Sequence, residues 1–311
     1  MASVEPGGDP LERPLADWGG APPPAPEWFA HAIAIAPQVR AIHVEGAKIE
    51  LLVWGKQGDP GIMLLHGFAG HAHWWAHIAP FLAERHRVVA VTWSGMGNSD
   101  WRPEYCVDQY AREALAAAEA ERFFEHAEKP VFIAHSLGGV PLLRLVDHIG
   151  DRLARAVLID TLLKPSRAPA LTGRIRETRL ADDPAALIAR FRLSPPSACA
   201  NPFVLDHFAR LGIVIGPDGV GYRWGMDPNL RERLVTHDVL EVLDRTPCPL
   251  TLLIGEESKV VTPRALAALT AVDRPGVSVV TIPQAGHHVL ADQPIALITA
   301  LKLLTTRTRA G

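Results

Sequence analysis

Two patterns of hydrophobic and polar positions organise the chain. Between residues 39 and 54, apolar and polar positions alternate in two runs separated by Glu45 and Gly46, which is typical of an antiparallel hairpin with one face in water. From Gly61 onward, continuous apolar runs alternate with helical patterns, and this predicts buried parallel strands with crossover helices. The predicted strands are 62–65, 88–93, 131–134, 155–159, 250–254 and 277–282. The expected fold class is α/β, with a mostly parallel central sheet and flanking helices.

Two segments interrupt this alternation. Residues 1–36 form a predicted N-terminal extension. Its first part, 1–26, is rich in proline and glycine and should be mobile or lie on the surface, whereas Trp28 and Phe29 begin an apolar segment that should pack on the main domain. Residues 163–246 contain several proline breaks and short helical patterns but no strong buried strand. We therefore expect a helical lid at 163–246, inserted between a first part of the sheet domain at 37–162 and a second part at 247–311.

The charge, the hydrophobic runs and the cysteines of the sequence indicate which kinds of molecule the protein binds. The 311 residues carry 31 basic and 34 acidic side chains, a net charge of −3, so nothing favours nucleic acid, and a small-molecule substrate is the expected partner. No apolar run approaches the roughly 18 residues of a membrane span and the first residues lack the pattern of a signal peptide, which predicts a cytoplasmic protein without membrane contact. The cysteines Cys106, Cys199 and Cys248 are widely spaced, and neither a disulfide framework, a metal nor a cofactor is expected. The sequence leaves the oligomeric state open.

The candidate chemistry centres on Ser136. The apolar run 131–134 leads through His135 to this serine, and a helical pattern begins at Val140, an order that predicts strand, sharp turn and helix. Such a turn is a nucleophile elbow, in which the positions two before and two after the serine must be small. Ala134 and Gly138 hold these positions, with alanine where glycine is usual. We therefore predict that Ser136 is a nucleophile.

A further turn, at residues 94–100, is rich in glycine, as phosphate-binding loops are. It lacks the Gly-Lys-Ser/Thr ending and the full glycine spacing of nucleotide-binding loops. We expect this turn to be structural.

Further motifs accompany the serine turn in a compatible order. They are His66-Gly67 after one predicted strand, Leu158-Ile159-Asp160, and Gly286-His287-His288 before 292–294. Over about residues 40–311 this set resembles the α/β-hydrolase family with a cap, and the resemblance implies that fold. It also implies that His287 is the general base, because a serine hydroxyl needs a neighbouring base to take its proton during attack. His288 is the competing candidate.

The carboxylate that should orient this base has two candidate positions. The commonest pattern of the family places the acid after the penultimate strand, three residues beyond a glycine, but Ser258 stands there in this chain. A minority of the family resembles an arrangement with the acid at the end of the strand after the nucleophile helix, where Asp160 lies. We expect Asp160 to be the acid. The alternative is that Asp160 caps the entry to the lid and that Glu257 or Glu256 supplies the carboxylate.

By the same resemblance, the backbone N–H groups of Phe68 and Leu137 would form the oxyanion hole. The implied function is a serine hydrolase that cleaves a carboxylic ester or lactone of a small, largely apolar substrate. Ser136 at the nucleophile position disfavours the aspartate-nucleophile dehalogenases and epoxide hydrolases. Carbon–carbon bond hydrolases and perhydrolases with the same triad remain alternatives, as does a hydrolase-fold protein that binds a ligand without turnover.

Overall fold

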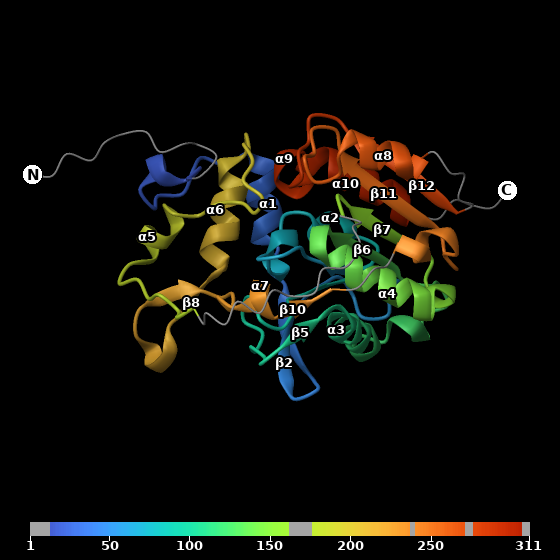
Figure 1. Ribbon diagram of the computed structural model, residues 1–311, viewed down its shortest axis with the longest axis horizontal. Coiled ribbons are helices and arrows are strands. Elements are labelled where there is room, and N and C mark those ends of the chain that lie inside the picture. The colour runs from blue at the N-terminus through green and yellow to red at the C-terminus, as the bar shows by residue number, and fades with distance from the viewer. Residues whose placement is uncertain (1–12, 162–175, 237–239, 271–275, 307–311) are drawn as a thin grey trace, which may run out of the picture.

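A central eight-stranded sheet organises the protein (Figure 1). The computed structural model describes residues 13–161, 176–236, 240–270 and 276–306. The strand order is β1-β2-β4-β3-β6-β7-β11-β12. Pairing is antiparallel between β1 and β2 and between β2 and β4, and it is parallel from β4 to β12. The strands are β1 (Gln38–Val44), β2 (Ala47–Trp54), β3 (Gly61–Leu65), β4 (Arg87–Val91), β6 (Val131–His135), β7 (Arg155–Ile159), β11 (Leu250–Gly255) and β12 (Val277–Ile282).

Helices cover both faces of this sheet, because successive residues of a buried strand point to opposite faces. In β3, Met63 and Leu65 pack into one apolar cluster, and Ile62 and Leu64 pack into the other. The first cluster includes residues of α3 (Val107–Ala120), α4 (Gly139–Ile149) and η7 (Leu240–Asp244), and Leu266 of α8 (Pro263–Thr270) packs against it. The second includes residues of α2 (Ala79–Leu82), α9 (Val289–Asp292) and α10 (Pro294–Thr305). The predicted α/β fold with a mostly parallel sheet is therefore confirmed.

Local differences from the predicted elements have simple causes. The helical pattern over 74–83 forms two short pieces, η2 (Ala72–Trp75) and α2, because Pro80 lacks the N–H that a continuous helix needs. The pattern over 108–128 ends as α3 at Ala120, since Arg122 adopts φ 61°, and a short turn, η3 (Phe123–Glu125), follows. After α4, the turn η5 (Gly150–Arg152) leads into β7.

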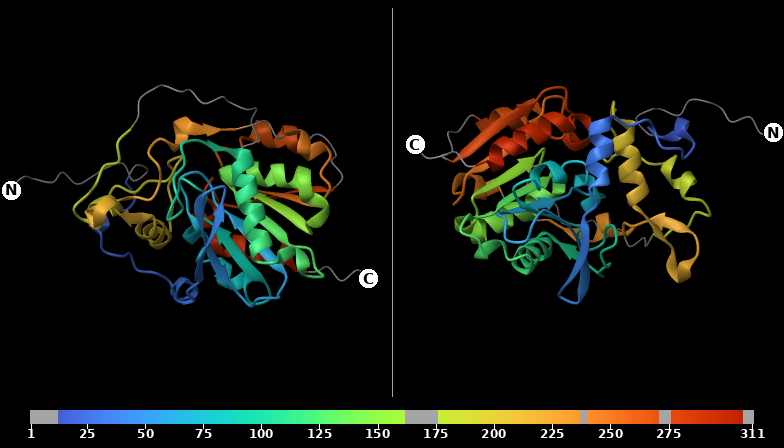
Figure 2. Two further views of the ribbon diagram at one scale, coloured as in Figure 1. Left: turned by 90° about the horizontal axis from the view of Figure 1, so that it is seen from below. Right: turned by 180° about the vertical axis from the view of Figure 1, so that it is seen from behind.

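The N-terminal segment packs against residues far along the chain. Residues 13–36 contain η1 (Ala16–Trp18) and α1 (Glu27–Ala34), and α1 lies beside α6 (Pro202–Leu211) in each view (Figures 1 and 2). Phe29 in α1 is 2% exposed and its ring centre lies 4.9 Å from that of Phe203. Leu15 is also fully buried. The expectation of a mobile or surface stretch is therefore wrong around Leu15, whereas Phe29 packs as expected.

The segment predicted as a helical lid has a mixed structure where it is described. It contains α5 (Pro184–Ile188), α6 and α7 (Leu230–Arg233), and also the strands β8 (Ile213–Ile215) and β9 (Tyr222–Trp224) joined by η6 (Pro217–Gly219). A further short strand, β10 (Leu234–Val235), pairs with β5 (Tyr105–Cys106). The expectation of an all-helical segment is thus corrected: β8 and β9 are short and only partly buried, so they leave no continuous apolar run in the sequence. Residues 163–175 lie outside the described residues.

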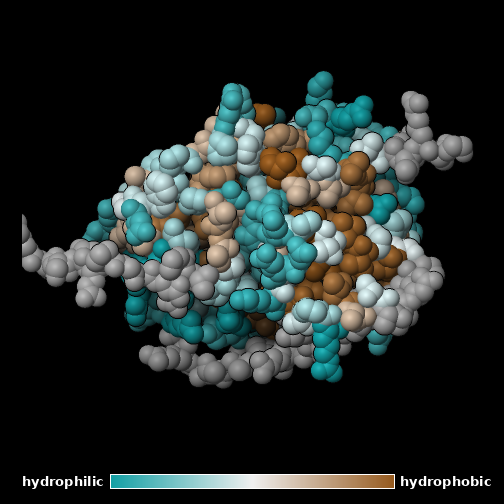
Figure 3. Space-filling view, turned by 90° about the horizontal axis from the view of Figure 1, so that it is seen from above, coloured by the Kyte–Doolittle hydropathy of each residue, from teal (hydrophilic) through white to brown (hydrophobic). Residues whose placement is uncertain are grey.

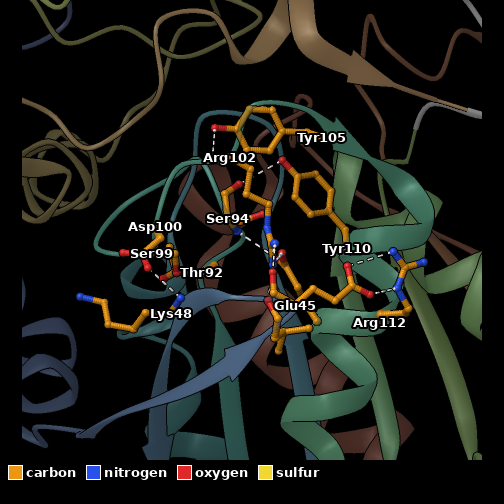
Figure 4. A network of polar contacts seen from close by, with 12 residues as sticks. Glu45, Lys48, Thr92, Ser94, Ser99, Asp100, Arg102, Tyr105, Tyr110 and Arg112 are labelled. Carbon is orange, nitrogen blue, oxygen red and sulfur yellow. Dashed lines mark hydrogen bonds and ion pairs between the residues drawn. The ribbon is translucent and has the colours of Figure 1, made fainter.

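The glycine-rich turn at residues 94–100 is held by a polar network (Figure 4). The hydroxyl of Tyr110 donates to the carbonyl of Ser94 at 3.1 Å, and the N–H of Ser94 donates to Glu113 at 3.0 Å. Arg102 forms an ion pair with the fully buried Glu113 at 3.2 Å. Tyr105 extends the network to Asp227, to which its hydroxyl donates at 2.8 Å. These contacts give the turn a structural role, and they link the sheet domain to the segment before α7.

Seen from above, hydrophobic residues gather over the right half of the molecule, where Figure 1 places β11, β12 and α8 (Figure 3). Val280 of the edge strand β12 is 38% exposed, and Ile295 and Leu303 of α10 are also exposed.

No helix in the described ranges is long and apolar enough to cross a membrane.

Candidate active site

The predicted site residues lie at one edge of the sheet, after the ends of parallel strands. Ser136 follows β6, Asp160 follows β7, and His287 lies in the loop between β12 and α9. The carboxyl ends of parallel strands meet at the same edge, and β6 and β7 are direct neighbours. Residues that are up to 151 positions apart in the sequence are thereby brought into contact.

A continuous chain of hydrogen bonds joins these side chains. Ser136 Oγ lies 2.9 Å from His287 Nε2, and His287 Nδ1 lies 2.6 Å from Asp160 Oδ2. A carboxylate only accepts, so Nδ1 carries the hydrogen and Nε2 presents its lone pair to the serine hydroxyl. Asp160 is 0% and His287 is 4% exposed, whereas Ser136 is only partly buried. Of these three hydrogen-bonded side chains, Ser136 is thus the one that a molecule from solution can reach.

The backbone is in the left-handed region at Ser136 and at Asp160, the first and last residues of this hydrogen-bonded triad. Ser136 has φ 53° and Asp160 has φ 45°. Non-glycine residues rarely adopt such angles, and each costs of order 1–3 kcal/mol unless the surrounding structure holds it. Here the turn lifts Ser136 off the end of β6 into η4 (Ser136–Gly138), which leads into α4. The sharp strand-to-helix turn expected from the sequence is therefore present.

Small residues let the loop after β3 approach this turn. A Cβ atom on Gly67 would lie 2.9 Å from Ser136 Cβ, and a Cβ on Gly138 would lie 2.6 Å from the carbonyl oxygen of His66. Any larger side chain would therefore push the two segments apart. Phe68 and Leu137 directly follow Gly67 and Ser136, and Leu137 lies in the first turn of η4, where backbone N–H groups have no acceptor within the helix. Both predicted oxyanion donors thus lie in the two segments that converge on Ser136.

The alternative candidates lie elsewhere. Glu257 is exposed, and its backbone N–H donates to Ala285 at 2.8 Å. Glu256 accepts from the backbone N–H of Gln284 at 3.0 Å. His288 Nε2 lies 3.1 Å from the carbonyl oxygen of Pro195. Among the described residues, Asp160 is the carboxylate that contacts His287, and His287 is the histidine that contacts Ser136.

Ser258 contacts Asp160, a role that its sequence position did not indicate. Its hydroxyl donates to Asp160 Oδ2 at 2.7 Å, and it accepts from the backbone N–H groups of Val260 and Val261, each at 3.1 Å. The position where most of the family is expected to carry the acid therefore holds a hydroxyl that donates to Asp160, the residue after β7. The strand order shows how this happens, because β11 lies beside β7.

His135 is a second residue whose role the sequence did not indicate. It immediately precedes Ser136, is 1% exposed, and places Nε2 3.0 Å from the backbone carbonyl oxygen of His287. This contact ties the serine turn to the loop that carries His287. The motif around Ser136 contained the residue, but no spacing rule connects it to a loop 152 residues away.

Burial sets the charge state of the ionisable groups around Ser136, His287 and Asp160. Desolvation, with the neighbouring histidines, lowers the pKa of His135 well below its ordinary value. It lowers the pKa of His288 to about 3. Burial raises the pKa of Asp292, which accepts from the N–H of Gly286 at 2.9 Å, to about 6. His135 and His288 are therefore neutral at pH 7, and Asp292 holds the turn that precedes His287.

Histidine is also the residue type through which this site could hold a metal. One ring nitrogen from each of His135, His287 and His288 lies within 4.8 Å of the other two. No other group of three histidine, cysteine or acidic side chains within the described ranges converges in this way.

Comparisons with known proteins agree with this architecture. Residues 62–301 match the model of the alpha/beta hydrolase family. The esterase Rv0045c of Mycobacterium tuberculosis is 29% identical over 85% of this chain and 89% of its own. A fluoroacetate dehalogenase of a Burkholderia species is 32% identical over 38% of this chain and 40% of its own. The solved thioesterase domain from the curacin biosynthetic pathway has a TM-score of 0.68 at 20% identity, covering 86% of this chain and 99% of that domain, a likeness of fold alone.

Proposed function

Because the chain belongs to the α/β-hydrolase family, we propose that it is a serine hydrolase that cleaves a carboxylic ester or lactone through an acyl-enzyme. The observation that carries this proposal is the hydrogen-bonded chain from Ser136 through His287 to Asp160. Similarity to an esterase over most of both chains supports ester chemistry. The dehalogenase similarity covers less than half of either chain, and Ser136 stands where the aspartate-nucleophile enzymes are expected to carry their nucleophile.

Each residue then has a defined step. His287 Nε2 takes the proton of Ser136 as Oγ attacks the substrate carbonyl, and it returns that proton to the leaving alcohol. Asp160 stabilises the imidazolium that forms between these transfers. Water then attacks the acyl-enzyme with His287 again as base, which releases the acid and restores the serine.

The developing oxyanion needs donors that are already in place. We assign them to the backbone N–H groups of Phe68 and Leu137, supported by the close approach of Gly67 to Ser136. Removing one such donor typically costs about 2.7–4 kcal/mol of barrier. These backbone donors require no particular side chain, so only the geometry of the two turns can preserve them.

The side chains near the serine favour a largely apolar substrate. Phe68 and Leu137 are both partly exposed beside Ser136. Trp74 lies behind His288, with ring centres 6.0 Å apart, and it stacks on Phe208 at 4.4 Å. The guanidinium of Arg231 lies 5.0 Å from the centre of the Phe68 ring. A small apolar acyl or alcohol group would contact Phe68 and Leu137, while Trp74 and Phe208 are buried beneath the site.

The first test is covalent labelling. The purified protein and its Ser136→Ala variant would be treated with a fluorophosphonate, and their intact masses would be measured. We expect one adduct on the wild type and none on the variant. In a separate assay, the untreated wild type should turn over repeatedly on members of a panel of esters and lactones. An unlabelled wild type would contradict an activated serine, and labelling without turnover would indicate a ligand-binding protein.

A further inference from the structure

Three buried histidines converge beside Ser136, and the proposed mechanism uses only one of them. His135, His287 and His288 are 1%, 4% and 2% exposed. One nitrogen of each ring lies within 4.8 Å of one nitrogen of each of the other two, and the ring centres of His287 and His288 are 4.8 Å apart. The cluster joins the end of β6 to the loop after β12, so it exists only in the folded protein.

Hydrogen bonds fix the tautomer of each ring. His135 Nε2 faces the carbonyl oxygen of His287, and His288 Nε2 faces the carbonyl oxygen of Pro195, at 3.0 and 3.1 Å. Carbonyl oxygens only accept, so both Nε2 atoms carry hydrogen and both Nδ1 atoms keep a lone pair. His287 has the opposite tautomer: its Nδ1 carries the hydrogen that Asp160 accepts, and its Nε2 keeps the lone pair. Each ring therefore presents one lone pair.

Two of these lone pairs have no partner. Nδ1 of His135 and Nδ1 of His288 are fully buried without a hydrogen bond to any described residue. Buried polar atoms are nearly always satisfied, and each exception needs an explanation. Two neighbouring exceptions of the same chemical kind, beside a third imidazole, form a donor set that a soft or borderline divalent cation satisfies.

We infer that His135, His287 and His288 form an inhibitory site for a divalent transition-metal ion, with Zn²⁺ as the representative ion. Zinc bonds to imidazole nitrogen at about 2.0–2.1 Å and is commonly tetrahedral, so the ligand atoms must approach one another to roughly 3.4 Å through rotation of the rings. Outer partners are already in place, since each ring donates its other N–H to a carbonyl or to Asp160. Ser136 Oγ, 2.9 Å from His287 Nε2, lies beside the fourth position.

The consequence for catalysis rests on the proposed function. An ion on His287 Nε2 occupies the lone pair that must accept the serine proton, so bound metal and turnover exclude each other. Ser136 is partly exposed, and the ion would enter from the same side as the substrate. Inhibition should be reversible, because no covalent bond to the protein is broken or made.

Binding and inhibition would be measured separately. ZnCl₂ would be titrated calorimetrically into the full chain, and Co²⁺ would serve as a spectroscopic substitute whose visible absorption reports tetrahedral coordination. We expect one ion per chain, loss of ester hydrolysis in parallel with occupancy, and recovery on adding EDTA. The Ser136→Ala variant should still bind the ion, which gives a readout that does not depend on turnover.

Matched variants assign the ligands. His288→Gln and His135→Gln each retain an N–H near the original Nε2 but remove the Nδ1 lone pair, and each should weaken Zn²⁺ binding at least tenfold. His43→Gln, on the exposed face of β1, should bind as the wild type does. Circular dichroism melting would establish that both site variants are folded. If the folded site variants bind Zn²⁺ as tightly as the wild type, or if the wild type binds none, the site is refuted.

The two proposals fail differently. Zinc binding that is lost in His288→Gln, in a protein that hydrolyses no ester, would uphold the metal site and reject the proposed function. Ester hydrolysis that Zn²⁺ leaves unchanged would uphold the function and reject the inhibitory site.

Discussion

Replacing Asp160 with asparagine tests the proposed triad most directly. Oδ2 of Asp160 accepts from both His287 Nδ1 and Ser258 Oγ, while Oδ1 faces the N–H of Gly255 at 3.4 Å. With the amide oxygen toward His287, the tautomer survives but the negative charge that stabilises the imidazolium is lost. With the amide nitrogen there, His287 must carry its hydrogen on Nε2 and cannot act as base.

The magnitude follows from these two orientations. Loss of a charge-assisted hydrogen bond costs about 1.5–3 kcal/mol, or roughly 10–150-fold in rate, whereas an inverted tautomer costs up to about 10⁴-fold, or roughly 5.4 kcal/mol. The hydroxyl of Ser258 already accepts from two N–H groups and must donate to its third partner, which favours the orientation with oxygen toward His287. We therefore expect kcat of Asp160→Asn to fall by about 10- to 150-fold, with about 10⁴-fold as the limit if the amide nitrogen faces His287 instead.

The assay is steady-state hydrolysis of an ester identified after labelling, with Glu257→Gln as the matched control. Glu257 is exposed and should retain kcat within about twofold. KM should change little in Asp160→Asn, because this buried side chain does not contact substrate. If Glu257→Gln lost more activity than Asp160→Asn, the acid would belong to the later turn and the reasoning would be refuted.

Two further predictions concern Ser258 and the buried histidines. Ser258→Ala should lower kcat only modestly, by at most about tenfold, because the hydroxyl holds Asp160 toward His287 but donates to it before the reaction begins as well, and an unchanged kcat would show that this hydroxyl is dispensable. Burial lowers the pKa of His66 and of His77 to about 4 and that of His288 to about 3. The unfolded chain therefore binds more protons on these histidines below about pH 6.5, and each of them should lower the free energy of unfolding by up to about 1.4 kcal/mol per pH unit as pH falls from about 6 toward 4. The raised pKa of Asp292 partly offsets this loss. Urea unfolding at several pH values measures this slope, and a flat profile would contradict neutral burial of these rings.

Local sequence signals determined the strands and the serine turn. The continuous apolar runs from Gly61 onward predicted buried parallel strands, and β7 and β12 have the predicted bounds. The small residues around Ser136 predicted a turn that the structure shows with φ 53°. These features depend on side-chain size and hydrophobicity over a few neighbouring positions, so they can be read without tertiary contacts.

Short elements and helix breaks were less predictable. The pair β8–β9 is only partly buried, so no apolar run marks it. Leu15 lies in a proline- and glycine-rich stretch, yet it is fully buried because it packs into a cluster with residues of α1 and α6. Such burial is decided by a distant surface that local composition does not describe.

The partners of each site residue were decided by the tertiary structure alone. The sequence contains 14 histidines, and local motifs could favour His287 but could not show that His135 binds its backbone across 152 positions. Likewise, Asp160 and Ser258 are close because β7 and β11 are adjacent in the sheet, a neighbour relation that follows from strand order. Hydrophobic patterning fixes which segments become strands, whereas the order in which they pair determines which polar groups meet at their ends.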